Sequence, residues 1–215
     1  YPYVARVIAR PGLTIHGSDN RAELQRAEHA LKLADEGRHV VVVSSGDPGV
    51  FAMASAVFEA VEIGPLSWRE LDISVLPGVT AMLAAAARLG APLGHDFCVI
   101  NLSDNLKPWS VIETRLRLAV EADFAMAFYN PRSKVRTEGF QKALDLLKSS
   151  CEKERLIMFA RAVSTPEESL RTVALSDATP DMADMRTMVL LGSRQTRLIP
   201  RKNAAPIVYT PRSIC

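Results

Sequence analysis

Two loops rich in glycine and proline contain the residue types best suited to hold a small ligand. The first spans residues 44–51 (SSGDPGVF), and the second spans residues 76–81 (LPGVTA). Glycine lets a backbone approach a ligand closely, and a loop that leads into a helix presents free N–H groups. Asp47 adds one carboxylate to the first loop, and Thr80 adds a hydroxyl to the second. Neither loop contains a nucleophile beside a base, so we expect both to bind a molecule rather than attack one.

The first loop departs from the common nucleotide-binding motifs. It has neither a G-x-G-x-x-G pattern nor a Lys-Ser/Thr pair after its glycines. Its aspartate would repel a phosphate group, whereas it would suit an amino or a hydroxyl group. An ordinary Asp-Pro-Gly turn has the same sequence, so this simpler interpretation stays open.

Each of these loops stands between a predicted strand and a predicted helix. Residues 40–43 are continuously β-branched or apolar, which is typical of a strand buried on both faces, and residues 72–76 predict the next strand. Ligands of open α/β sheets bind at the carboxyl ends of such strands, where both loops stand. The helices after the loops are expected to bury Phe51, Ala54, Phe58 and Val61 in the first case and to span the Ala-rich residues 81–89 in the second.

The rest of the chain continues to alternate between strand and helix patterns. Strands are predicted at 97–102, 124–129, 156–160 and 188–191, with an edge strand at 207–209. Helices are predicted from Asn20 (capped with Glu23), from Pro108, around 140–147 and from residues 164–168 (STPEE). This alternation predicts an α/β fold whose later strands belong to a mixed sheet.

Two further polar loops follow predicted strands. Residues 129–133 (YNPRS) place Asn130 before a proline, so we expect an extended Asn130 whose amide faces a cleft. Residues 103–109 (SDNLKPW) place Asp104 near Trp109, and a tryptophan at such a position belongs to a core more often than to a ligand platform.

Composition excludes several classes of partner. The formal net charge is +2 without any block of like charges, so nucleic acid is not an expected partner. No apolar run approaches the length of a membrane span, and no membrane partner is expected. The three cysteines are far apart and lack a CxxC pattern, which favours a reducing, cytoplasmic location. The four histidines lack the spacing of metal ligands, so no metal site is predicted.

Residues 41–51, followed by residues 76–81, resemble the tetrapyrrole (corrin/porphyrin) methylases, the S-adenosylmethionine-dependent enzymes of cobalamin and sirohaem synthesis. The likeness extends over nearly the whole chain. Longer motifs favour the ring-contracting branch of the family; they lie at 12–16 (GLTIH), 101–109 (NLSDNLKPW), 129–133 and 191–197 (LGSRQTR). The resemblance implies two α/β domains, residues 1–80 and 81–215, with the cofactor in a cleft between them. It also implies a homodimer and a tetrapyrrole substrate.

The resemblance also implies which residues contact the cofactor, S-adenosyl-L-methionine. The Gly-Asp-Pro loop and the Thr-Ala pair hold it in the family, and backbone near two later strand ends lines it. Carried over to this sequence, these contacts fall on Ser45, Gly46, Asp47, Val50, Thr80, Ala81, Ala127, Tyr129, Asn130 and Ala162.

Four residues are candidates for catalytic groups in such an enzyme. Asp47 is placed to act on the cationic sulfur of the cofactor or on the edge of the tetrapyrrole. Ring contraction needs a group that moves a proton, and Asp104, Asp19 or His16 could do so. The substrate carries many carboxylates, for which the candidate partners are Arg132, Arg161 and Arg197.

Members of the family open with a strand and a Gly-x-Gly-Pro-Gly loop that reaches substrate and cofactor. No such segment precedes Tyr1, so we expect the first strand of the fold to be missing from this chain. Three alternatives stay open: a corrin methylase that acts at C11 or C20, an enzyme whose substrate already contains cobalt, and a cofactor-binding paralogue without activity.

Overall fold

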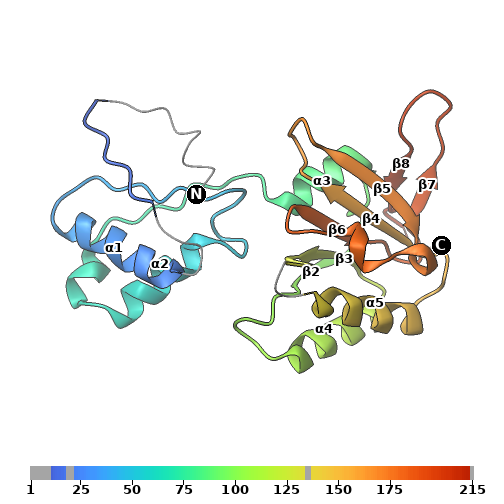
Figure 1. Ribbon diagram of the computed structural model, residues 1–215, viewed down its shortest axis with the longest axis horizontal. Helices are drawn as coiled ribbons and strands as arrows, with labels where there is room; N and C mark the ends of the chain where they lie inside the picture. Colours follow the sequence, from blue (N-terminus) through green and yellow to red (C-terminus); the bar gives the residue numbers. More distant parts are fainter. Residues whose placement is uncertain (1–10, 18–21, 134–136, 214–215) are drawn as a thin grey trace. The chain divides into compact units, whose positions relative to one another are not determined.

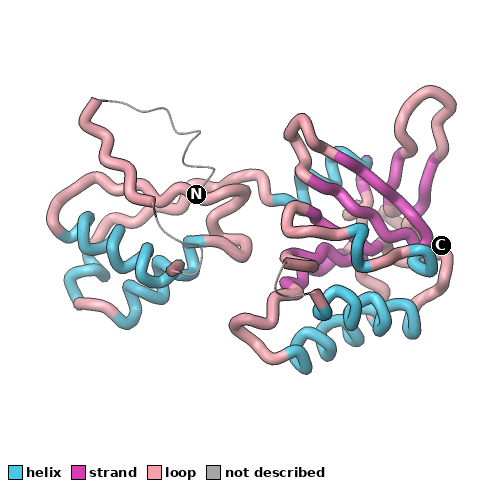
Figure 2. The backbone as a smooth tube through the Cα atoms, viewed as in Figure 1, coloured by secondary structure: helices cyan, strands magenta, loops and turns pink. Residues whose placement is uncertain are grey.

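The computed structural model describes residues 11–17, 22–133 and 137–213, and the chain divides into two compact units, residues 1–80 and 81–215. Figure 1 shows the elements of both units, and Figure 2 shows that helices and loops make up the first unit whereas the strands belong to the second. None of the helices in these ranges is long and apolar enough to cross a membrane.

The first unit is built on two packed helices, α1 (Glu23–Asp35) and α2 (Met53–Ile63), followed by the 3-10 helix η2 (Leu66–Glu70). The buried residues between them are mostly small: Ala27, Leu31, Met53, Ala56 and Ala60. Gly37, with φ +84°, follows the end of α1, as its position in the sequence indicates. The predicted cap of α1 at Asn20 lies outside the described residues.

The two strands predicted for the first unit are wrong. Within its described residues no strand is assigned, and residues 40–43 and 72–76 are irregular segments. Val42 and Ile73 pack against the helix cluster, whereas the side chain of Val41 is 84% exposed. Only one face of each segment is therefore covered. A strand also needs a partner for its backbone hydrogen bonds, which a run of β-branched residues does not supply by itself.

The buried face predicted for α2 is wrong in part, although Val61 packs against the helix cluster as expected. Phe51 precedes the helix, with φ +51°, and both Phe51 and Phe58 are exposed. Met53, Ala56 and Ala60 face α1 instead. The helix begins two residues later than the pattern of aromatic residues suggested, and this shift rotates its buried face.

The second unit contains two sheets. The five-stranded sheet has the order β2-β3-β6-β4-β5, and the three-stranded sheet has the order β1-β8-β7. Only the β2–β3 pair of the larger sheet is parallel, so the expected mixed sheet is confirmed. The strands are β1 (Gly90–Ala91), β2 (Phe97–Asn101), β3 (Ala125–Tyr129), β4 (Leu156–Arg161), β5 (Ser169–Ala174), β6 (Thr187–Leu191), β7 (Arg197–Ile199) and β8 (Ile207–Tyr209).

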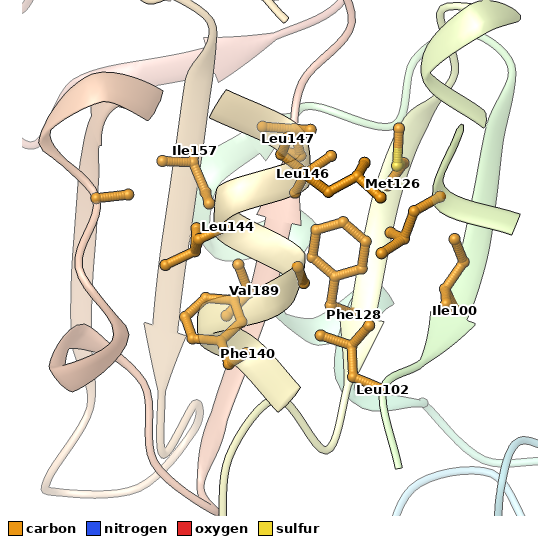
Figure 3. Packing of buried hydrophobic residues seen from close by; sticks show 14 of the residues in the cluster. Ile100, Leu102, Met126, Phe128, Phe140, Leu144, Leu146, Leu147, Ile157 and Val189 are labelled. Atoms are coloured by element: carbon orange, nitrogen blue, oxygen red, sulfur yellow. The ribbon is translucent and has the colours of Figure 1, made fainter. Parts of the chain in front are cut away.

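Helices cover both faces of the five-stranded sheet. Helices α4 (Trp109–Glu121) and α5 (Glu138–Ser150) pack on one face, where Phe128, Phe140 and Ile157 are among the buried residues (Figure 3). Helix α3 (Ala81–Leu89) packs on the other face, and its small residues Ala85 and Ala86 lie against the sheet. Two 3-10 helices, η3 (Leu175–Asp177) and η4 (Pro180–Met182), connect β5 to β6.

Two predictions for the second unit need correction. Residues 164–168 do not start a helix; they form a turn that leads into β5. The side chain of Glu168 folds back to accept a hydrogen bond from the backbone N–H of Ser164 at 2.8 Å, and β5 then pairs with β4 instead of coiling. The strand at 207–209 is not an edge strand, because β8 lies between β1 and β7.

One edge of the five-stranded sheet gathers the ends of three strands. Strands β3 and β4 both run antiparallel to β6, and β2 runs parallel to β3. Asn101, Tyr129 and Arg161 therefore end their strands at a common edge, where β5 and β6 begin. We call this end of the sheet, where β2, β3 and β4 end, the carboxyl edge. The loops that follow these strands lie there and can face a ligand.

The opposite edge of the same sheet is held by an ion-pair network. The side chain of Arg155 is only 1% exposed, and its Nη2 lies 2.9 Å from Asp123 Oδ1 and 2.8 Å from Glu152 Oε2. Arg194 Nε lies 2.7 Å from Glu152 Oε1. A hydrogen bond from its own backbone N–H, together with those from Arg194 and Arg155, lowers the pKa of Glu152 to about 2. This network joins the beginnings of β3 and β4 to the segment after β6.

Candidate cofactor-binding site

In the first unit, one carboxylate joins the two loops singled out by the sequence. Asp47 Oδ1 accepts a hydrogen bond from the backbone N–H of Gly49 at 2.8 Å, within its own loop. Asp47 Oδ2 accepts another from the backbone N–H of Gly78 at 3.0 Å, across 31 residues of chain. The simple turn interpretation accounts for the first bond but not for the second. The two loops therefore form a single structural element.

The backbones of the two loops also touch. A Cβ atom added to Gly78 would collide with the carbonyl oxygen of Gly46, so only glycine fits at position 78. Gly46 itself has φ +71°, a conformation that glycine adopts without strain. Sequence spacing placed both glycines in loops, but their contact with each other is a property of the fold.

Most of the predicted cofactor contacts of the first unit are accessible. Ser45 and Gly46 are exposed, and Asp47 and Val50 are partly exposed. Thr80 is buried, at the point where the second loop leads into α3. Since each oxygen of Asp47 accepts one backbone N–H, the carboxylate orders the loop backbone. A carboxylate has about four acceptor positions, so it can still accept an amino or hydroxyl group.

In the second unit, Tyr129 ties the carboxyl edge to helix α3. Its phenolic oxygen accepts a hydrogen bond from the backbone N–H of Met82 at 3.2 Å. Ala81, the first residue of α3, is exposed beside this contact. Ala127, two residues before Tyr129 in β3, is fully buried. The predicted contacts Ala81 and Tyr129 are thus brought together by the fold.

Asn130 is held in an unexpected conformation at the end of β3. Its φ is +52°, so the predicted extended backbone is wrong. Asparagine tolerates the left-handed region better than most residues, which explains how it adopts this conformation before a proline. Its Nδ2 donates to Asn101 Oδ1 at 3.1 Å, and the same oxygen accepts the backbone N–H of Ser103 at 2.9 Å. The amide of Asn130 therefore links the ends of β2 and β3.

Ala162 is the second left-handed residue at the carboxyl edge. It follows β4, is buried, and has φ +48°. Its backbone N–H donates to the carbonyl oxygen of Arg186 at 2.9 Å, just before β6. An alanine in this region costs on the order of 1–3 kcal/mol, and such strain persists only where the surroundings impose it. Strained residues of this kind concentrate at binding sites, which supports the prediction made for Ala162.

The other candidate catalytic residues lie in different settings, and Asp19 lies outside the described residues. His16 is exposed, and its Nδ1 lies 3.3 Å from Nε2 of His29 on α1, with the two rings in an edge-to-face arrangement. Asp104 is exposed in the loop that follows β2 at the carboxyl edge. Trp109 packs partly buried against the core of the second unit, as predicted. Across the described ranges, no three His, Cys, Asp or Glu side chains gather as a potential metal site.

The candidate arginines also differ in availability. Arg161 Nε lies 2.8 Å from Asp184 Oδ2, so its charge is already paired. Burial opposes the ionisation of Asp184, but hydrogen bonds from Thr187 and Arg161 hold the pKa of its carboxyl below the usual value. Arg132 reaches the carbonyl oxygen of Pro180 at 3.4 Å, and Arg197 is exposed in β7.

Sequence reasoning missed the residues that hold the carboxyl edge together. Asn101 lies within the motif at 101–109, and its side-chain oxygen joins the ends of β2 and β3, a role that the motif does not predict. Arg88 and Glu168 form an ion pair of 2.6 Å across 80 residues of sequence, and no local pattern indicates such a pair.

Comparison with known proteins places this fold in a family. The profile of the Tetrapyrrole (Corrin/Porphyrin) Methylases matches residues 6–179. This chain belongs to that family. The resemblance stated from the loop sequences is therefore confirmed. The structure of the cobalt precorrin-4 methyltransferase CbiF, 22% identical with a TM-score of 0.60, covers 84% of this chain and 73% of its own, and it supports the α/β fold class.

Individual relatives are more similar. A precorrin-3B C(17)-methyltransferase from Sinorhizobium sp. is 51% identical over 99% of this chain and 84% of its own length. A probable cobalt-factor III C(17)-methyltransferase from Salmonella typhimurium is 39% identical over 87% of this chain and 77% of its own length. The crystal structure of the methyltransferase CobJ has 63% identity and a TM-score of 0.92, and the match covers 98% of this chain and 85% of that one.

Proposed function

We propose that this chain is an S-adenosylmethionine-dependent C-methyltransferase of cobalamin biosynthesis that methylates precorrin-3B at C17, with ring contraction to precorrin-4. The observation that carries the proposal is the 51% identity over 99% of the chain to the sinorhizobial precorrin-3B C(17)-methyltransferase. The loops are consistent with it, because they combine close backbone approach with few charged groups.

The residues present fit the proposed cofactor. S-adenosylmethionine offers amino, carboxylate, hydroxyl and adenine groups, which backbone N–H and C=O groups recognise without a dedicated charge cluster. Residues with accessible surface carry backbone groups of this kind in each unit: Ser45 and Gly46 in the first, and Ala81 and Asn130 in the second. We assign the cofactor contacts to Ser45, Gly46, Asp47, Val50 and Thr80 in the first unit, and to Ala81, Ala127, Tyr129, Asn130 and Ala162 in the second.

Methyl transfer of this kind depends on positioning more than on acid–base groups. When bound, the cofactor supplies an electrophilic methyl group on a cationic sulfur. The protein has to hold the accepting carbon in line with it, and such orientation contributes up to roughly 7–11 kcal/mol in favourable cases. Asp47 contributes by fixing two loops against each other, and its negative charge complements a cation. The Tyr129 hydroxyl contributes by fixing the start of α3.

The proton movement of ring contraction is assigned to one of two exposed groups. Asp104 is a carboxylate at the carboxyl edge, and His16 has its Nδ1 beside His29. For the carboxylates of the substrate, Arg132 and Arg197 are better candidates than Arg161, because Asp184 already pairs with Arg161. The homodimer and the cytoplasmic location are proposed with the same function.

A second candidate function has its own observation. The Salmonella relative acts, by its name, on cobalt-factor III and is 39% identical over 87% of this chain. Both substrates should therefore be offered to the purified protein together with S-adenosylmethionine, and methylated product should be identified by mass. We expect precorrin-3B to be methylated faster. Preference for cobalt-factor III would favour the second candidate. Methylation of neither substrate by a protein that still binds S-adenosylmethionine would favour the cofactor-binding paralogue without activity.

A further inference from the structure

The turn between β4 and β5 carries two strained residues. Ala162 has φ +48° and Ser164 has φ +64°, so two non-glycine residues lie in the left-handed region within three positions. Both conformations are strained, and such strain persists only where the surrounding contacts impose it. The turn therefore needs groups that hold it from outside its own backbone.

Glu168 holds the turn through the backbone of Ser164. Its Oε2 accepts the N–H of Ser164 at 2.8 Å, which fixes the second strained residue. A backbone hydrogen bond from Thr165 N to Ala162 O at 3.2 Å then ties this part of the turn to the first strained residue. The carboxylate of Glu168 therefore acts on Ala162 through one intervening turn of backbone.

Arg88, near the end of α3, holds the side chain of Glu168 in place. Its Nε and Nη2 both donate to Glu168 Oε1, at 2.8 and 2.6 Å. The side chain of Glu168 is 17% exposed, whereas that of Arg88 is 57% exposed. The hydrogen bond from Arg88, together with the one from Ser164, lowers the pKa of Glu168. The carboxylate is thus held ionised between a backbone donor and a guanidinium group.

Helix α3 connects this contact to the rest of the carboxyl edge. Its first turn meets Tyr129 through the N–H of Met82, and its last turn meets Glu168 through Arg88. The helix begins at Ala81, a proposed cofactor contact, and spans nine residues. One short, rigid element therefore links the start of α3, the end of β3 and the turn after β4.

We propose that Glu168, anchored by Arg88, is a positioning residue of the cofactor site, which sets the backbone of the turn at Ala162. This inference rests on the proposed function, because it takes Ala162 as a cofactor contact. Glu168 touches no reacting atom in this account and acts only through the turn. Its expected effect is on the affinity for the cofactor more than on the rate of methyl transfer.

The test measures S-adenosylhomocysteine binding by calorimetry, using the full chain and the variants Glu168→Gln and Arg88→Ala. Each should raise the Kd about tenfold, since one charge-assisted contact is lost. The double variant should bind no more weakly than the weaker single variant, because both changes break one chain of contacts. In activity assays the KM for S-adenosylmethionine should rise while kcat changes little.

Glu113→Gln is the matched control, because Glu113 pairs with Arg117 at 2.7 Å on α4, outside the carboxyl edge. It should leave the Kd unchanged. Wild-type binding with an unchanged Kd in Arg88→Ala and Glu168→Gln would overturn this inference alone. Failure of the wild type to bind S-adenosylhomocysteine would overturn the proposed function as well. Arg88 is largely exposed, so its variant keeps the test decisive if Glu168→Gln does not fold.

Discussion

The two units position similar loops in different ways. In the first unit, both loops follow segments without strand pairing, and a single carboxylate holds them together through Gly49 and Gly78. In the second unit, the loops follow paired strands of a five-stranded sheet, and side-chain contacts hold them in addition to the strand pairing. A ligand loop can therefore be fixed either by one local contact or by a sheet.

The two units also differ in the size of their hydrophobic clusters. The described cluster of the first unit has five buried residues, three of them alanine, whereas the clusters of the second unit have twenty and nine. Single changes in the loops of the first unit should thus affect binding with little effect on overall stability. In the second unit, substitutions at the Arg155 network should change stability, whereas substitutions at the carboxyl edge should change cofactor binding.

The largest effect is expected on stability, at the network opposite the site. Arg155→Met removes a buried guanidinium between Asp123 and Glu152, and should lower the free energy of unfolding by about 2–3 kcal/mol. Urea unfolding followed by circular dichroism measures this. Arg117→Met, which breaks an exposed pair on α4, is the control and should cost far less. Equal losses in the two variants would contradict the role given to the network.

The next effect is expected at the loop contact of the first unit. Gly78→Ala forces a Cβ against the carbonyl oxygen of Gly46, and overpacking of this kind costs about 1–3 kcal/mol, which would weaken cofactor binding about tenfold to hundredfold. Gly17→Ala is the matched control, since a Cβ at Gly17 meets no atom within 4 Å. Calorimetry with S-adenosylhomocysteine distinguishes the two, and similar Kd values for both would show that the loops need not touch.

A smaller effect is expected when the carboxylate that joins the loops is neutralised. Asp47→Asn keeps the shape but presents an NH₂ group to one of the two backbone N–H donors, so the Kd should rise about fivefold to tenfold. Asp35→Asn, in the same unit, replaces an exposed carboxylate that accepts from Ser67 and should leave the Kd unchanged. Wild-type affinity in Asp47→Asn would mean that other contacts hold the two loops of the first unit together.

The smallest effect is expected at the end of β3, because the pairing of β3 with β2 and β6 already fixes this strand. Tyr129→Phe removes the acceptor for the N–H of Met82 and should raise the Kd about threefold. Tyr209→Phe in β8 is the control. A larger loss in Tyr129→Phe than in Asp47→Asn would reverse the contrast between the two units.

Much of the second unit could be predicted from sequence, because its elements carry continuous patterns. Strands β2, β3, β4 and β6 lie within about a residue of their expected positions, as do helices α3 and α4. The secondary structure of the first unit could be predicted less well. Residues 40–43 have the composition of a buried strand, but strand formation depends on a partner that composition does not reveal.

The candidate site was predictable as a set of loops but not as a set of contacts. The Gly-Asp-Pro and Pro-Gly motifs located both loops of the first unit, yet the bond from Asp47 to Gly78 spans 31 residues. Residues 164–168 have the composition of a helix start, and the pairing of β5 with β4 overrides it. The left-handed Asn130 departs from the usual restriction before proline; asparagine tolerates this conformation, and its amide bond to Asn101 holds it there.

The most direct test of the central claim is the position of the transferred methyl group. The purified full chain should be incubated with precorrin-3B and S-adenosylmethionine that carries ¹³C in its methyl group, and the product examined by NMR. We expect a single labelled methyl on C17 of a contracted ring. A label on another ring carbon, or no label in the tetrapyrrole, would contradict it.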